Sequence, residues 1–414
     1  MLRAARGKWR VPSPEQFFHR TCRGRGAPSI CAAMLRIVKY NADHTCTMSD
    51  GSVRQLATKA ARKSIPQPVQ QAQQAVWLDC DPGHDDAMAI LLAGYHPCVS
   101  LLGISTVHGN QSVAKTTVNA LACLRAFGMD SDNLPVVRGQ ARPLVRPPTH
   151  CAEIHGETGL DNLEGEPLFP LPRDPDAMLV SGKCVNVMYE HISRAALSGQ
   201  RVKLVATGAL TNVALLLTLY PELVEEDALE VVFMGGAIGL GNTGPVAEFN
   251  MQIDPEAAKV VFESGAKVTM VPLEVTHTAL ATEAVISEIR EDGSSEFRNA
   301  LCDLLSFFKD TYKSYFGFDD PPLHDPCAVA YVIDPDLFET EDMRVDVETH
   351  SDLAAGQTVC DRHNLQKKPK NATVACEMDV EEFWDLIHNA IYAAEKKMDH
   401  GSKRKRGGAE EGGS

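Results

Sequence analysis

Four aspartates lie within eight residues of one another, at Asp79, Asp81, Asp85 and Asp86. An apolar run leads into this group and an apolar, helix-forming run leads out of it, with the turn signal Pro-Gly between the two pairs. The pattern predicts a strand, a sharp loop and a helix, with two carboxylates at the strand end and two at the helix start. Two unit charges about 4 Å apart in a partly buried site repel each other by roughly 4 kcal/mol. The carboxylates must therefore be protonated or neutralised.

A bound divalent cation would neutralise this charge better than the helix N-terminus, which supplies only about half a charge. The candidate ligands are hard carboxylate oxygens, and the group has no histidine or cysteine at zinc-ligand spacing. This chemistry favours Ca²⁺ or Mg²⁺ over zinc. The alternative is a solvated acidic loop in which one aspartate caps the helix, although capping needs fewer carboxylates than are present here.

The surrounding chain alternates strand-like and helix-like blocks, which is typical of an α/β fold with a parallel sheet. The predicted elements are strands at residues 99–107, 202–206, 229–234 and 268–273, and helices at 111–127, 211–219 and 254–264. Polar residues follow several of these strands, and ligands bind at the carboxyl edge of open parallel sheets. We therefore expect an open, mostly parallel, Rossmann-like sheet with helices on both faces and an active site at its carboxyl edge.

Short motifs follow one another along the chain: Asp79–Ala87, His108–Gln111, His155–Asp161, Thr207–Asn212, Met234–Gly236, Ala247–Asn250 and Pro322–Cys327. In this order they resemble the inosine-uridine-preferring nucleoside hydrolase family, which includes uridine nucleosidases. The resemblance extends over residues 76–395. It implies hydrolysis of the N-glycosidic bond of ribonucleosides, such as uridine and inosine, to ribose and the free base, with one bound Ca²⁺.

The resemblance also implies roles for individual residues. Asp81 would bind calcium and take the proton from the attacking water, and His324 would protonate the leaving base. The other implied calcium ligands are Asp86, Asp325 and the backbone carbonyl of Thr207. The implied substrate-binding residues, which contact the ribose hydroxyls or line the pocket, are Asp85, Asn110, His155, Met234, Asn242, Glu248 and Asn250. Of these, His155 is placed on a mobile loop that covers the pocket.

Three other functions remain open. Purine-restricted members of the same family typically place tryptophans around the base, whereas Trp9, Trp77 and Trp384 all lie outside the predicted pocket loops. A phosphohydrolase of the haloacid dehalogenase type would hold Mg²⁺ on paired strand-end aspartates, although Gly83 and the aspartate pair after it fit that pattern poorly. The third is a non-catalytic Ca²⁺-binding protein of the same fold, although every implied ligand position is filled here.

Several other residues near these motifs are not assigned to the reaction by the resemblance. Tyr312 and Tyr315 are predicted on an amphipathic helix, where each either packs in the core or lines the base pocket. His84 lies between the paired aspartates and is expected to take no part in the reaction. His277 follows a predicted strand and is expected to be structural.

The ends of the chain differ from its body. Residues 1–75 carry 13 Lys and Arg against 3 Asp and Glu, so the net charge of −15 leaves −25 for the remainder. We predict a basic, disordered extension at 1–75, a hydrolase domain at 76–398 and a disordered basic, Gly-rich tail at 399–414. An acidic body argues against nucleic acid as a partner, and the lack of any apolar stretch of 18 residues argues against a membrane span.

The 12 cysteines contain no CxxC pair, which indicates reduced thiols and a reducing compartment. We expect a cytoplasmic protein, or a nuclear or mitochondrial one if the basic ends act as signals. The expected partners are a ribonucleoside substrate and, by the family resemblance, further copies of the chain in a homodimer or homotetramer.

Overall fold

The computed structural model describes the backbone of residues 45–47, 53–55, 73–129, 134–291 and 295–410. The chain divides into two compact units, Met1–Val69 and Gln70–Ser414. In the first unit, strands β1 (Thr45–Thr47) and β2 (Val53–Gln55) pair antiparallel. The predicted disordered extension at 1–75 otherwise falls almost entirely outside the described residues, and the first strand of the second unit begins at Gln74.

The second unit is built on a sheet that has nine strands in the described residues, in the order β10-β9-β11-β8-β7-β6-β3-β4-β5. Pairing is parallel from β11 to β5, whereas β9 runs antiparallel to both β10 and β11. The predicted mostly parallel α/β sheet is thus confirmed. The strands are β3 (Gln74–Cys80), β4 (Val99–Thr106), β5 (Val136–Arg138), β6 (Val202–Ala206), β7 (Leu229–Met234), β8 (Val268–Val271), β9 (Phe338–Val347), β10 (Thr358–Asp361) and β11 (Ala372–Met378).

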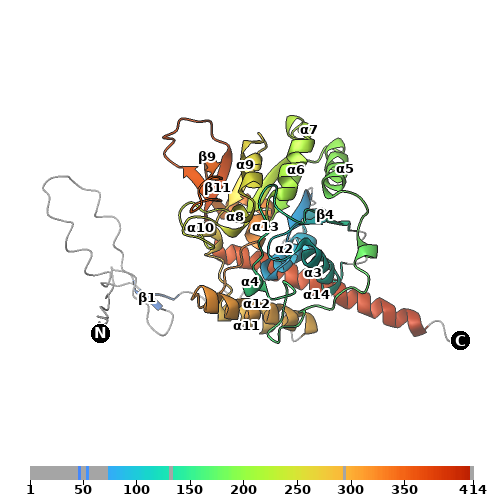
Figure 1. Cartoon of the computed structure of the whole chain (residues 1–414). Coiled ribbons are helices and arrows are strands. Elements are labelled where there is room, and N and C mark those ends of the chain that lie inside the picture. The colour runs from blue at the N-terminus through green and yellow to red at the C-terminus, as the bar shows by residue number, and fades with distance from the viewer. Residues whose placement is uncertain (1–44, 48–52, 56–72, 130–133, 292–294, 411–414) are drawn as a thin grey trace, which may run out of the picture. The chain divides into compact units, whose positions relative to one another are not determined.

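Helices lie on both faces of this sheet (Figure 1), because the central strands are apolar on both sides. Along β3, Val76, Leu78 and Cys80 belong to one buried cluster, and Ala75 and Trp77 belong to another. The first cluster includes residues of α2 (His84–Tyr95), α3 (Val113–Ala126), α12 (Glu296–Tyr315), α13 (Pro326–Ile333) and α14 (Val380–Glu410). The second includes residues of α5 (Cys184–Leu197), α6 (Thr211–Leu219) and α9 (Pro255–Glu263).

Shorter helices connect the layers, and none of the described helices is long and apolar enough to cross a membrane. They are α4 (Ala152–His155), α7 (Glu222–Glu225), α8 (Phe249–Ile253), α10 (Leu273–Thr276), α11 (Glu283–Glu291), and the 3₁₀ turns η1 (Asp176–Met178) and η2 (Pro335–Leu337).

The predicted boundaries are close to the observed ones. β6, β7 and α6 match their predicted ranges, whereas β8 stops at Val271 because Pro272 has no N–H for the ladder. The larger difference is at the C-terminus, where α14 continues to Glu410 although a disordered tail was predicted from residue 399. Lysine and arginine, which are frequent in this segment, are good helix formers.

Candidate active site

Strand β3 and helix α2 bring the aspartates of the sequence motif to the carboxyl edge of the sheet. Asp86 lies in the first turn of α2, where its Oδ1 accepts a hydrogen bond from Asp81 N (3.2 Å) and its Oδ2 accepts one from Gly83 N (3.0 Å). The hydroxyl of Thr207, which follows β6, donates to Asp86 Oδ1 at 2.8 Å. Asp86 therefore fixes the turn between β3 and α2 and connects it to the neighbouring strand.

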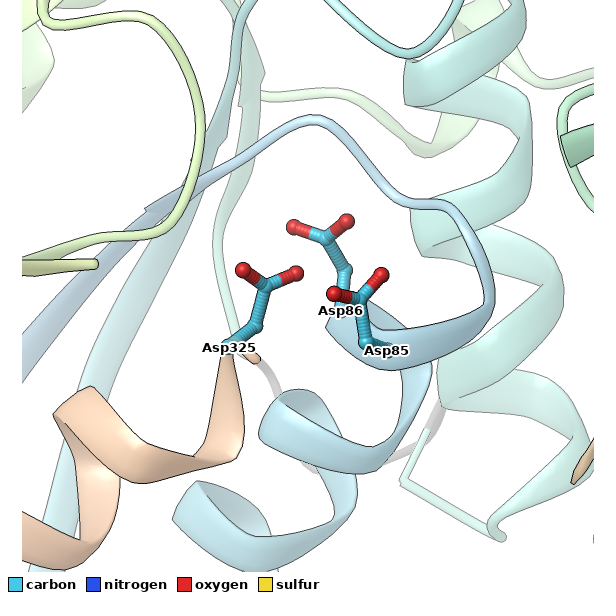
Figure 2. A group of neighbouring side chains, drawn as sticks. All are labelled: Asp85, Asp86 and Asp325. Carbon is cyan, nitrogen blue, oxygen red and sulfur yellow. The ribbon is translucent and has the colours of Figure 1, made fainter. Parts of the chain in front are cut away.

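Asp85, Asp86 and Asp325 form a buried group that we call the acidic cluster (Figure 2). The first two lie on α2, Asp325 immediately precedes α13, and one oxygen of each lies within 4.8 Å of the others. Burial raises the pKa of Asp325 well above its usual range, and the neighbouring Asp85 and Asp86 raise it further. Burial, followed by the charge of Asp86, raises the pKa of Asp85 to about 8. The three groups therefore cannot all be ionised near neutral pH without a cation.

Asp81 is completely buried beside the acidic cluster. Its Oδ2 accepts a hydrogen bond from Asn110 N (2.7 Å), whereas its Oδ1 has no hydrogen-bonding partner among the described residues. A Cβ atom at Gly109 or Gly208 would overlap the Asp81 carboxylate, so the fold needs glycine at both positions. Burial and then the charge of Asp86 raise the pKa of Asp81 well above its usual range.

These donors fit a hard divalent cation. The acidic cluster and the unpaired Asp81 oxygen offer only carboxylate oxygens, the ligands that Ca²⁺ and Mg²⁺ take up. Two predicted ligands, Asp86 and Asp325, belong to the cluster, and Asp81 lies next to it. Asp85 was predicted to contact ribose, but the structure places it among the candidate ligands as well.

A pocket adjoins the acidic cluster at the carboxyl edge. All the predicted site residues line it except Asp81 and Asp86, which are fully buried. Its walls come from the loops after β4, β6 and β7, the N-terminus of α2, helices α4, α8 and α12, and the segment before α13. The lining residues are Asp85, Asn110, Cys151, Ile154, His155, Thr207, Met234, Asn242, Thr243, Glu248, Phe249, Asn250, Phe308, Tyr312, Phe316, His324 and Asp325.

One part of the lining, which we call the polar wall, contains Asn242, Glu248 and Asn250. The Glu248 carboxylate caps α8 by accepting from Asn250 N (2.9 Å) and Met251 N (3.2 Å), and burial raises its pKa to about 7. Asn250 Nδ2 donates to Thr207 O at 2.8 Å, which leaves a second lone pair on that carbonyl for a ligand. The polar wall is thus held rigidly by its own backbone contacts.

Another part of the lining, the aromatic wall, contains His155, Phe308, Tyr312, Phe316 and His324. The rings of Phe308 and Tyr312 pack edge to face at 4.7 Å, and Tyr312 lies 5.0 Å from Phe316. Such a surface suits a flat heterocycle. Tyr312, for which the sequence left two roles open, therefore lines the pocket.

Hydrogen bonds on both sides of His324 determine where its proton lies. Nδ1 lies 2.7 Å from the Thr276 hydroxyl and Nε2 lies 2.8 Å from the Tyr312 hydroxyl. Among the described residues, His324 Nδ1 is the only hydrogen-bonding partner of the buried Thr276 hydroxyl, so Thr276 donates to it. Burial, helped by the nearby His277, lowers the pKa of His324 well below its usual range. Neutral His324 then carries its proton on Nε2 and donates it to Tyr312, whose own O–H is free for the pocket.

His155 lines the pocket at the C-terminal end of α4, and its ring is in contact with His84. The two Nδ1 atoms are 3.3 Å apart, and His84 Nε2 lies 2.9 Å from Asp161 O. We expected His84 to take no part in the reaction, and that expectation did not include its contact with His155 in the pocket wall. The mobility of the loop at 155–161 stays a prediction.

His277 packs edge to face with His324, with 5.5 Å between the ring centroids. Tyr315 is 59% exposed and lies outside the pocket lining.

Sequence reasoning missed several lining residues. Phe308 precedes Tyr312 by four positions on α12, so its presence on the same helix face could have been inferred. Phe249 lies between two predicted residues of the polar wall. Phe316 follows Tyr312 by four positions at the C-cap of α12, so the same spacing indicates it. Cys151, Ile154 and Thr243 gave no signal, because their place in the pocket depends on how distant loops fold together.

Comparison with known proteins identifies relatives over this region. Residues 76–385 match the family described as inosine-uridine preferring nucleoside hydrolase. A probable ribonucleoside hydrolase from Dictyostelium discoideum is 48% identical over 324 residues, which cover 76% of this chain and 94% of the relative. The pyrimidine-specific ribonucleoside hydrolase RihA from Shewanella oneidensis is 42% identical, with 76% and 95% covered. Among solved structures, a purine-preferring ribonucleoside hydrolase from Gardnerella vaginalis aligns with a TM-score of 0.69 at 29% identity, covering 78% of this chain and 99% of that one.

The fold, the site and these similarities define an enzyme that acts on N-glycosyl bonds. The chain belongs to the inosine-uridine preferring nucleoside hydrolase family. The matched region contains every residue of the acidic cluster and of both pocket walls.

Proposed function

We propose that this enzyme hydrolyses the N-glycosidic bond of ribonucleosides, uridine and inosine among them, to ribose and the free base, with Ca²⁺ as its cofactor. The observation that carries the proposal is that the acidic cluster, the polar wall and the aromatic wall surround one pocket. A nucleoside has the same division into a polar sugar and a flat base, joined by a single bond.

Asp81, Asp86, Asp325 and the Thr207 carbonyl would hold the ion, and Asp85 would reach both the ion and the sugar. When bound, Ca²⁺ would supply the positive charge that keeps the buried carboxylates ionised and would bind ribose hydroxyls. Among the described residues, Asn250 Oδ1 and Asn242 Nδ2 have no protein partner, so both can bind further hydroxyls.

Asp81 then acts as the general base. Its carboxylate, which the ion would keep ionised, takes the proton of the attacking water, which adds to the anomeric carbon as the bond to the base breaks. Positive charge develops on the sugar in such reactions. The buried carboxylates of Asp85 and Glu248, which both line the pocket, would stabilise that charge.

The departing base needs a proton, and we assign its delivery to Tyr312 and His324 acting as a pair. The Tyr312 O–H is free to donate into the pocket, and His324 Nε2–H then stabilises the phenolate that forms. His324, which the family resemblance implies as the acid, would thus act through Tyr312. The phenol regains its proton from water once the products leave.

Two observations argue against the alternative substrates, a phosphate ester and a purine-restricted set of nucleosides. Among the described residues that line the pocket there is no lysine or arginine, which a phosphate ester would need. Trp77 and Trp384 are buried in the two cores away from the lining, and Trp9 lies outside the described residues, so the tryptophans of a purine-restricted site have no described counterpart.

Release of reducing sugar from uridine, inosine, cytidine and adenosine, with and without EDTA, would test the proposal. We expect ribose release that EDTA abolishes and Ca²⁺ restores, with much less from 2′-deoxynucleosides, because a missing hydroxyl leaves buried polar groups unpaired. Phosphate release from UMP without ribose release from uridine would instead support a phosphohydrolase. Restoration by Mg²⁺ but not by Ca²⁺ would overturn the choice of ion.

We also propose that the enzyme works in the cytoplasm as a homodimer or homotetramer, without nucleic acid or membrane partners. The family resemblance and the acidic body support this proposal. Light scattering after size-exclusion chromatography and fractionation of cells would test it.

A further inference from the structure

His84 connects the helix that carries Asp85 and Asp86 to the loop that carries His155. It is the first residue of α2 and is completely buried, directly before Asp85 and Asp86. These two aspartates point toward Asp325 (Figure 2). The His84 ring instead stacks on Phe307 of α12, with 4.6 Å between centroids and 4° between planes.

Both ring nitrogens of His84 are directed at the loop of residues 155–161. Nε2 lies 2.9 Å from Asp161 O, and a carbonyl oxygen only accepts, so Nε2 donates to it. The backbone N–H of His84 donates to His155 Nδ1 at 3.3 Å, and the His84 ring stacks on the His155 ring with 5.5 Å between centroids. The main chain and the side chain of one residue therefore both meet the ring of His155.

Other hydrogen bonds fold this loop but do not reach the His155 ring, which also lies 5.6 Å from the Phe308 ring. The Asp161 carboxylate accepts from Glu157 N (2.8 Å) and Thr158 N (3.1 Å), and Asn119 Nδ2 donates to Thr158 O (3.0 Å). Within the described residues, hydrogen bonds to the His155 ring come from His84 alone, and His155 Nε2 has no protein partner. Because His155 lines the pocket, Nε2 is the ring atom left for substrate.

We propose that His84 is a positioning residue that fixes the His155 ring in the aromatic wall, so that binding of the base depends on a side chain that does not line the pocket. The inference rests on the proposed nucleoside substrate. Loss of the His84 ring removes its stacking on His155 and its bond to Asp161 O without removing any hydrogen bond of the acidic cluster, since none of those bonds uses the His84 ring. Base binding therefore weakens while ion and sugar binding persist.

Two variants separate positioning from general damage. His84→Leu keeps apolar bulk against Phe307 and the backbone N–H, but it loses the bond to Asp161 O and the ring that stacks on His155. His84→Gln keeps an amide that can donate to Asp161 O, so it should restore part of the function. His96→Gln, at the C-cap of the same helix, is the matched control.

The first measurement is hydrogen exchange of the amides of residues 155–161 in the Ca²⁺-loaded enzyme. Faster exchange in this segment for His84→Leu, partial protection for His84→Gln and no change for His96→Gln are expected. Unchanged exchange in His84→Leu would overturn the proposal. Hydrogen exchange does not depend on catalysis, so this measurement tests the role of His84 even if the enzyme does not hydrolyse nucleosides.

The second measurement compares ligands. For His84→Leu we expect KM for uridine and inosine to rise roughly tenfold or more, the usual effect of losing a buried hydrogen bond. The inhibition constant of free ribose and the Kd of Ca²⁺, measured by calorimetry, should each change by less than about twofold, well below the change in KM. An equal loss of ribose or Ca²⁺ affinity would show that His84 only supports the start of α2, and the proposal would be wrong. Absence of ribose release by the wild-type enzyme would instead refute the proposed function.

Discussion

Replacing Tyr312 with phenylalanine tests how the base leaves the sugar. The change removes one oxygen atom and keeps the ring that packs on Phe308 at 4.7 Å. It deletes the hydroxyl that lies 2.8 Å from His324 Nε2, which is the group we assign as the immediate proton donor. Loss of general acid catalysis typically costs about 10²–10⁴-fold in rate. Because His324 Nε2–H then faces the pocket directly and can donate in part, we expect kcat/KM to fall by about 10²-fold, near the lower limit.

The assay compares nucleosides with p-nitrophenyl riboside, whose leaving group departs without a proton. Tyr312→Phe should slow uridine and inosine but change p-nitrophenyl riboside by less than about threefold, because only the first two need the acid. Tyr315→Phe, three residues along α12 with a side chain that is 59% exposed, should change neither and serves as the control. Equal losses on both kinds of substrate would refute the acid role and assign Tyr312 to packing. No loss on either would place the proton donor elsewhere.

Three further perturbations address the carboxylates. Asp81→Asn should retain inhibition by free ribose but lower kcat by about 10²–10⁴-fold, because an amide cannot take the proton from water; a full loss of ribose binding would contradict this. Asp325→Asn should abolish most of the rise in melting temperature that Ca²⁺ gives the wild-type enzyme, because a ligand stabilises the native state according to its affinity; an undiminished rise would exclude Asp325 as a ligand. Without Ca²⁺, the free energy of unfolding should fall as pH rises from about 4 to about 8. Burial raises the pKa of Asp79 and Glu248 to about 7 and that of Asp85 to about 8, so the native state keeps protons that the unfolded state has released. Urea unfolding in EDTA across this range measures the trend, and a rising free energy would contradict it.

The central sheet could be predicted because its strands have simple local signals. β6 and β7 are buried on both faces and are bounded by polar turns, so their apolar runs have the length of a strand. The antiparallel strand β9 is different, since all four residues at 339–342 are exposed and polar. Its pairing depends on β11, which comes about 25 residues later in the chain and lies beside it, and the local sequence of β9 does not encode that pairing.

In the candidate site, too, contacts within one motif could be predicted, whereas contacts between residues far apart in the sequence could not. Asp81 and Asp86 lie in one motif, and the turn between β3 and α2 alone is enough to bring them together. Tyr312 and His324 are twelve residues apart, and Thr276 is farther still, so their hydrogen-bonded chain depends on how α10, α12 and α13 pack. Sequence reasoning could assign an acid role to His324 by resemblance, but only the fold places a phenol beside its Nε2.

Burial explains why the acidic cluster can serve both stability and chemistry. Each carboxylate lies at the end of a rigid element, so the charges cannot separate when no ion is bound. Protonation is then the only way to relieve their repulsion, and this is why burial moves their pKa values upward rather than opening the site. A protonated Asp81 cannot take a proton from water. The same cation that neutralises Asp85, Asp86 and Asp325 therefore also sets the protonation state on which the general base depends.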